Sequence, residues 1–182
     1  MKNLESIKVG SRELTAEEII KYLLILNEKL KQNNKHGELS MVGGAVMCLV
    51  FESRLSTFDI DAIFSPHGEI EKLIFDIADE YKLPKHWINE GVAMYLSKKG
   101  EFSEYRNLSN LKIYVATPEY MLAMKALSAR IGNINELKDI KFLINYLDLK
   151  SSDDVFKVIG KFYSLDEFKV RFYLILKEIF SE

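Results

Sequence analysis

The stretch that decides the fold is MVGGAVMCLVFESRLSTFDIDAIF, residues 41–64. It has the pattern of a short strand, a tight glycine turn, a short apolar helix and a second strand. In the second strand, residues 58–64, apolar and acidic residues alternate, so Asp59 and Asp61 point to one face. The pattern predicts that the opposite face is apolar and carries Phe58, Ile60, Ala62 and Phe64.

The two aspartates are candidates for binding a divalent cation. Asp59 and Asp61 lie two residues apart on one strand, which places their side chains about 6–7 Å apart. Carboxylates on one face repel each other unless a cation neutralises them, and hard oxygen ligands suit Mg²⁺ (or Mn²⁺). Mg²⁺ takes one or two carboxylates together with phosphate oxygens of a substrate. The alternative is that both aspartates are solvated on an exposed sheet face.

The glycine pair upstream is a candidate for holding phosphate. Gly43 and Gly44 lie between a strand and the start of a helix, where backbone N–H groups are free and the helix dipole favours an anion. Most Gly-Gly pairs form turns only. A Gly-Gly turn followed by a strand with an Asp-x-Asp pattern is more specific, because it supplies phosphate and metal sites at neighbouring strand ends. This combination favours metal-assisted attack on a nucleoside triphosphate.

Outside this stretch, hydrophobic periodicity predicts mixed structure followed by helices. Thr15 and Glu18 form a capping box at the start of the first helix, and Thr117 caps the first of the later ones. The predicted strands span residues 39–42, 58–64, 92–97 and 111–115, with a loop or hairpin between the last two. The predicted helices span residues 15–34, 45–52, 69–82, 117–130, 136–147, 152–163 and 165–181.

These elements predict an α+β fold. A small mixed β-sheet flanked by helices, residues 1–116, is followed by a helical C-terminal region, residues 117–182, which packs on it. Hydrophobic residues make up 48% of the 182 residues, enough for a buried core.

Charge and cysteine content narrow the function class. The net charge of −2 argues against a non-specific nucleic-acid binder. The single cysteine, Cys48, excludes an internal disulfide and lies in an apolar run typical of a small buried residue. Because the sequence has neither a signal peptide nor a membrane-spanning segment, we expect a cytoplasmic protein without a membrane partner.

The same motif resembles the signature of the nucleotidyltransferase superfamily. The stretch from Gly43-Gly44 to RLSTFDID, residues 54–61, carries the resemblance, which is closest to the bacterial branch of AbiEii-type toxin nucleotidyltransferases and related uncharacterised domains. It covers most of the chain from about residue 38. Supporting segments are LPKHWIN at residues 83–89, TPEYMLAMK at residues 117–125, Ala129-Arg130 and Lys138-Asp139.

The resemblance implies a role for each motif residue. Gly43 and Gly44 would hold the triphosphate, and Asp59 and Asp61 would ligate Mg²⁺. Lys125 would contact phosphate or the leaving group, since lysine binds phosphate as a point charge. Asp139 would complete the site from a helix. For Lys125 the alternative is an exposed helix lysine, and for Asp139 a solvated partner of Lys138. Arg54 and Arg130 could also meet phosphate, although surface arginines are common.

The implied function is a nucleotidyltransferase that transfers a nucleoside monophosphate from an NTP to an unidentified acceptor: tRNA, a protein or a small molecule. The resemblance also implies a toxin–antitoxin or phage-defence role, and the expected protein partner is an antitoxin or a second copy of the chain. The alternatives are a catalytically inactive binding protein on the same fold and a dimerising structural protein.

The chain departs from the family in having Gly-Gly where many members have Gly-Ser. It also lacks an acidic residue in the predicted strand at 111–115, where active members often carry a third carboxylate, and Phe142 stands where relatives often show a second aspartate. The candidates for a third carboxylate from another segment are Glu101, Glu104 and Asp139.

Overall fold

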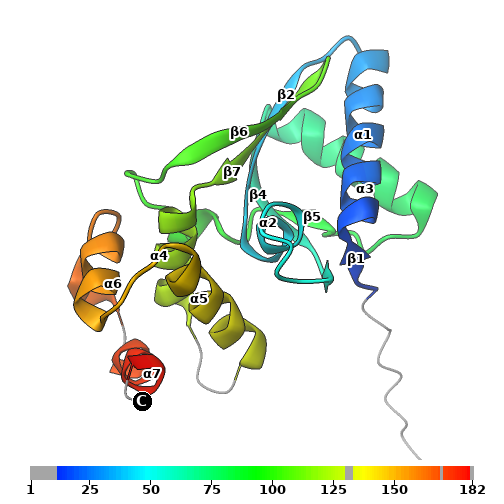
Figure 1. Cartoon of the computed structure of the whole chain (residues 1–182). Coiled ribbons are helices and arrows are strands. Elements are labelled where there is room, and N and C mark those ends of the chain that lie inside the picture. The colour runs from blue at the N-terminus through cyan, green and yellow to red at the C-terminus, as the bar shows by residue number, and fades with distance from the viewer. Residues whose placement is uncertain (1–11, 130–132, 169, 181–182) are drawn as a thin grey trace, which may run out of the picture.

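The computed structural model describes residues 12–129, 133–168 and 170–180, which form a mixed α+β fold. The predicted order, a mixed sheet with helices followed by a helical region, is confirmed (Figure 1). The main sheet has the strand order β5-β4-β2-β7-β6. Its strands are β2 (Gly37–Val42), β4 (Ile60–Ser65), β5 (Ile88–Asn89), β6 (Phe102–Asn107) and β7 (Leu111–Ala116).

Strand direction brings four strand ends to one edge of the sheet. β2 runs parallel to β7 and antiparallel to β4, while β5 runs parallel to β4. The carboxyl ends of β2 and β7 therefore lie at the same edge as the amino end of β4. Val42 pairs with Asp61 there, and Asp61 pairs with Asn89 on the other side. The Gly43 turn and the Asp-x-Asp strand are thus adjacent in space.

Helices α1 (Ala16–Gln32) and α3 (His67–Tyr81) pack against each other over one face of the sheet (Figure 1). The predicted capping box is present, because Glu18 N–H donates to Thr15 Oγ1 and Thr15 N–H donates to Glu18 Oε2. The short helix α2 (Gly43–Leu49) follows β2 directly and is buried on most sides. A small antiparallel pair, β1 (Leu14–Thr15) and β3 (Ser56–Thr57), lies beside α1 and α2.

The helical region begins where β7 ends. Thr117 caps α4 by accepting a hydrogen bond from Tyr120 N–H, and Pro118 occupies the first turn, as predicted. Helix α4 packs against both α5 and α6, and α6 packs against α7. In Figure 1 these helices gather beyond the edge of the sheet at which β7 ends. The helices are α4 (Pro118–Ser128), α5 (Ile134–Tyr146), α6 (Ser152–Ile159) and α7 (Val170–Phe180).

The structure differs from several predictions about secondary structure. Residues 92–97 contain a single 3₁₀ turn, Ala93–Tyr95, rather than a strand. The last predicted helix, residues 165–181, begins with a second 3₁₀ turn, Leu165–Glu167, and α7 starts only at Val170. β6 lies in the stretch expected to be a loop or hairpin, and its polar residues are explained by its place at the exposed edge of the sheet. Phe58 precedes β4 and is 51% exposed, so it does not share the buried face of Ile60.

Asn27 is a buried polar residue that ties α1 to the β6–β7 turn. Its Oδ1 accepts from Asn110 N–H at 2.9 Å, and its Nδ2 donates to Ser109 Oγ at 3.3 Å. Asn27→Ala leaves the Asn110 N–H without this acceptor, and we expect the free energy of unfolding to fall by about 1–3 kcal/mol. Urea unfolding followed by the fluorescence of the single tryptophan, Trp87, measures it. The exposed Asn145→Ala is the control, and an equal loss in both variants would contradict the prediction.

Candidate functional site

The turn at Gly43 presses the end of β2 against the Asp61 side chain. Gly43 has a φ of +71°, in the left-handed region that favours glycine. A Cβ built on Gly43 would stand 2.7 Å from Asp61 Oδ2, closer than real Cβ atoms come to other atoms. Both the backbone conformation and the space therefore require glycine, and the missing side chain is what lets the carboxylate lie against the turn.

Gly44 has the same steric requirement for a different neighbour. A Cβ there would stand 2.4 Å from Thr57 Oγ1 and 3.5 Å from Arg54 Nη1. Thr57 is buried at 6% exposure and belongs to β3. The two glycines thus bring Asp61, Thr57 and Arg54 into direct contact with the first turn of α2.

Asp59 and Asp61 form a partly buried pair with too little positive charge around it. Burial raises the pKa of Asp59, against a hydrogen bond from Asn89 that lowers it. Burial, and then the charge of Asp59, raise the pKa of Asp61 to about 6, although Lys125 and Asn89 act in the opposite direction. A bound cation would lower both pKa values, because it would stabilise the carboxylates in place of the lost water and would weaken their mutual repulsion.

Asp139 holds two cations beside the pair. It is 2% exposed and accepts two hydrogen bonds from Arg54, from Nε to Oδ1 at 2.7 Å and from Nη2 to Oδ2. Lys125 Nζ lies 2.8 Å from Asp139 Oδ2. The group, which we call the Arg54–Asp139–Lys125 triad, joins the α2–β3 loop to α4 and α5. Both oxygens of Asp139 are engaged by these cations.

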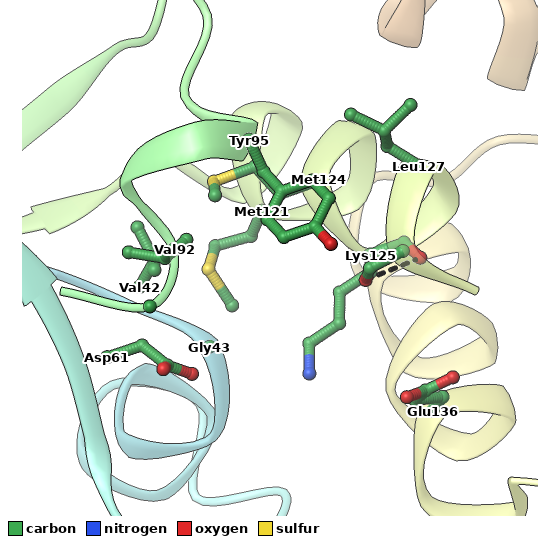
Figure 2. Close-up of a pocket in the computed structure, with 12 residues that line it drawn as sticks. Val42, Gly43, Asp61, Val92, Tyr95, Met121, Met124, Lys125, Leu127 and Glu136 are labelled. Atoms are coloured by element: carbon green, nitrogen blue, oxygen red, sulfur yellow. Dashed lines mark hydrogen bonds between the residues drawn. The ribbon is translucent and has the colours of Figure 1, made fainter. Parts of the chain in front are cut away.

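A cavity of about 540 Å³ opens between Asp61 and the helical region. Figure 2 shows Asp61 on one side, Glu136 on another, and the Lys125 ammonium pointing into the space between them. The rest of the wall is largely apolar. Its lining residues include Gly43, Val92, Tyr95, Met121, Met124 and Leu127.

A second cavity, of about 470 Å³, has two members of the triad, Arg54 and Asp139, in its wall. Arg54, Thr57 and Asp139 line it, together with Phe58 and Leu55, which is 93% exposed. Asp59 lies between Phe58 and the first residue of β4, one residue outside the strand that was expected to carry both carboxylates, so this cavity borders the segment of the carboxylate pair.

The donor set fits one hard divalent cation. Asp59 and Asp61 supply carboxylate oxygens, and the glycine turn keeps other side chains away from Asp61. Mg²⁺ needs only one or two protein carboxylates when a substrate supplies phosphate oxygens. Within residues 12–129, 133–168 and 170–180, no cluster of three or more His, Cys, Asp or Glu side chains is placed to hold a metal ion by itself.

Most of the residues singled out from the sequence lie in one region. Gly43, Asp61 and Lys125 line the first cavity, and Asp139 is linked to it through Lys125. Gly44 and Asp59 are close neighbours of these residues but are not in the lining of either cavity. Glu101 and Glu104 lie at or beside β6, separated from β4 by β7 and β2. Arg130 lies outside the described residues.

The role of Asn89, which donates a hydrogen bond to Asp59, is not predicted from the sequence. Arg54 was expected to be an ordinary surface arginine, but it binds the buried Asp139. Only strand pairing places Asn89 beside Asp61, and no local pattern signals it.

The raised pKa of Asp61 predicts an inverse pH dependence of stability in the absence of metal. Its folded-state pKa of about 6 exceeds the ordinary 3.8. The folded chain therefore binds this proton more tightly than the unfolded chain, and the free energy of unfolding falls as pH rises from about 4 to about 6. After allowance for solvent screening, metal-free Asp61→Asn is expected to be about 1–2 kcal/mol more stable than the native chain at pH 7.

Urea unfolding in a chelator at pH 4.5 and pH 7 measures the difference between variant and native chain. If the pKa of Asp61 is raised, the difference in free energy of unfolding between Asp61→Asn and the native chain is smaller at pH 4.5 than at pH 7. Asp79→Asn, at an exposed site on α3, is the control, and loss of stability in Asp61→Asn at pH 7 would contradict the prediction.

The triad predicts a large structural cost for removing its anion. Asp139→Asn leaves Arg54 and Lys125 without the charge that pairs them, and we expect a loss of about 3–5 kcal/mol in the free energy of unfolding. The matched control is Asp148→Asn, which breaks an ion pair with Lys150 that is exposed on both sides and should cost less than about 1 kcal/mol. Equal costs in the two variants would rule out an anchoring role for Asp139.

Comparisons with protein-family models, with curated proteins and with solved structures gave no match to this chain. In the described part of the chain, no helix has both the length and the apolar character needed to cross a membrane. The case for a function therefore rests on the geometry of the glycine turn, the carboxylate pair and the triad.

Proposed function

We propose that the chain is a nucleotidyltransferase that moves a nucleoside monophosphate from an NTP to an acceptor, with Mg²⁺ or Mn²⁺ as cofactor. One observation carries the proposal: the Asp61 carboxylate lies against Gly43 at the mouth of a cavity that the Lys125 ammonium also enters. A carboxylate pair, a side-chain-free turn and a cation around one space are the groups that phosphoryl transfer needs.

The chain's own groups have separate roles in this proposal. Asp59 and Asp61 hold the cation, and the bound cation shields the charge of the phosphates and of the attacking oxygen. Lys125 offsets the negative charge that develops on the leaving pyrophosphate. The ion pair with Asp139 holds the Lys125 ammonium in this position. The oxygen of the acceptor hydroxyl attacks the α-phosphorus and its proton passes to solvent, the bond from that phosphorus to the bridging oxygen breaks, and pyrophosphate leaves.

The apolar wall of the first cavity suits the base and sugar of the nucleotide. A volume of about 540 Å³ lies within the range of small-molecule sites, which are mainly apolar with a few placed polar groups. Met121, Met124 and Tyr95 offer a broad, polarisable surface to a base. The second cavity is the place we assign to the acceptor, because Phe58 in its wall directly precedes Asp59 and because Arg54 and Asp139 connect it to Lys125 in the first cavity.

The acceptor stays open between tRNA, a protein and a small molecule. The resemblance to AbiEii-type toxins supports a toxin–antitoxin or phage-defence role in the cytoplasm, with an antitoxin or a second copy of the chain as partner. These assignments rest on similarity of motif rather than on the geometry of the site.

A second candidate is a nucleotide-binding protein without turnover. It is favoured by the finding that the described residues offer no cluster of three metal-holding side chains. On this alternative the carboxylate pair and Lys125 bind an Mg²⁺–nucleotide complex, and the chain acts as a sensor or partner protein.

Transfer of label from α-³²P NTPs tests the first candidate. Incubation of the chain with each NTP, Mg²⁺, and total RNA or cell lysate is expected to label one acceptor class. Asp59→Ala with Asp61→Ala should lower the rate roughly 1,000-fold or more, because the cation is worth several kcal/mol to the transition state.

The charge-matched control is Asp76→Ala with Asp79→Ala on the exposed face of α3, which should retain full activity. Labelling that survives in the Asp59/Asp61 variant would refute the assigned site. Nucleotide binding by calorimetry without any labelled product would establish the second candidate instead.

A further inference from the structure

Asn89 occupies the position next to the carboxylate pair on the neighbouring strand. β5 runs parallel to β4, and Asn89 is the register partner of Asp61. Its Nδ2 donates a hydrogen bond to Asp59 Oδ2 at 3.1 Å. β5 itself is held in place, because Trp87 O accepts from Ile60 N–H and the buried Trp87 indole donates to Ile74 O.

The orientation of the Asn89 amide is fixed at both ends. Its Oδ1 accepts from Gly91 N–H at 2.9 Å, so the oxygen is committed to the chain and the NH₂ group must face the carboxylates. Gly91 is suited to this role, since a Cβ there would stand 2.8 Å from Asn89 Oδ1. Gly91 also lines the first cavity, which links this amide to the cavity wall.

An amide is the side chain that orients this pair without neutralising it. A lysine or arginine at residue 89 would bind the carboxylates permanently and compete with a metal ion. An apolar residue would leave Asp59 Oδ2 without its donor, and a carboxylate would add repulsion. A neutral donor binds the carboxylates, chiefly Asp59 Oδ2, without cancelling their charge, so that the pair can still ligate a cation.

We propose that Asn89 is a positioning residue that orients the Asp59 carboxylate so that the pair holds a single divalent cation. The inference rests on the proposed function, because it assumes that Asp59 and Asp61 bind metal. It adds a residue that contacts no metal or substrate and acts through Asp59. The amide oxygen is committed to Gly91 N–H, so Asn89 adds no ligand atom for a second cation.

Two substitutions at residue 89 separate this role from a purely structural one. Asn89→Asp keeps an oxygen acceptor for Gly91 N–H, so the local turn survives, but it replaces the donor to Asp59 by a third anion. Asn89→Leu removes both hydrogen bonds. A structural role limited to the turn predicts that Asn89→Asp leaves metal binding unchanged.

Mn²⁺ binding, measured by electron paramagnetic resonance of free Mn²⁺ and by calorimetry, gives a readout that does not need activity. We expect one Mn²⁺ per native chain, about 10-fold weaker affinity in Asn89→Leu and about 10-fold tighter affinity in Asn89→Asp. The opposite signs at one residue are the signature of the proposed role. Asn107→Leu and Asn107→Asp, at an exposed residue of β6, are the matched controls and should not change the affinity.

The outcomes separate this inference from the proposed function. Mn²⁺ binding that is the same in the native chain and in folded Asn89→Asp would overturn the inference alone. Absence of Mn²⁺ binding by the native chain would overturn both. If Asn89→Leu does not fold, as judged by circular dichroism, the Asn89→Asp result decides.

Discussion

The repulsion between Asp59 and Asp61 is the constraint around which the rest of this site is arranged. Two carboxylates that are two residues apart in the chain are partly removed from water, and burial, followed by their mutual repulsion, raises the pKa of Asp61 to about 6. A protein that needed only stability would place apolar or amide groups here. None of the neighbouring groups neutralises the pair. Gly43 has no side chain, Asn89 is a neutral amide, and Lys125 is already paired with Asp139.

The topology explains why these features meet. β2 and β7 run in the same direction, so α2 and α4 both begin at the edge where the antiparallel β4 starts. The first helix brings the glycine turn and the second brings Lys125. Asp139 on α5 forms ion pairs with Lys125 on α4 and with Arg54 in the α2–β3 loop. This buried carboxylate therefore links the two helices to the segment beside the sheet.

The features that sequence could predict are those encoded in consecutive residues. The alternation around Asp59 and Asp61 predicted their strand, and the capping residues Thr15 and Thr117 predicted helix starts correctly. Features that depend on distant pairing were missed or misplaced. β6 is polar because it lies at an edge, Asn89 gains its meaning only from its register with Asp61, and the contact from Arg54 to Asp139 spans 85 residues. A local sequence pattern does not indicate which distant residues become neighbours in the fold.

The formal charges of the site couple the cation to the nucleotide. Asp139 cancels one of the two positive charges of its triad, and the one that remains faces the two negative charges of Asp59 and Asp61. With Glu136, which also lines the cavity, the ionised site without metal carries a formal net charge of −2 and repels a triphosphate, whereas one bound dication brings it to neutrality. On the proposed function, metal and nucleotide must then strengthen each other's binding, and by linkage the coupling is equal in both directions. Protons compete with the cation for the pair, since a carboxylate must be ionised to ligate a metal. On the proposed function, the same repulsion that destabilises the metal-free site would make it selective for a metal–nucleotide complex over the nucleotide alone.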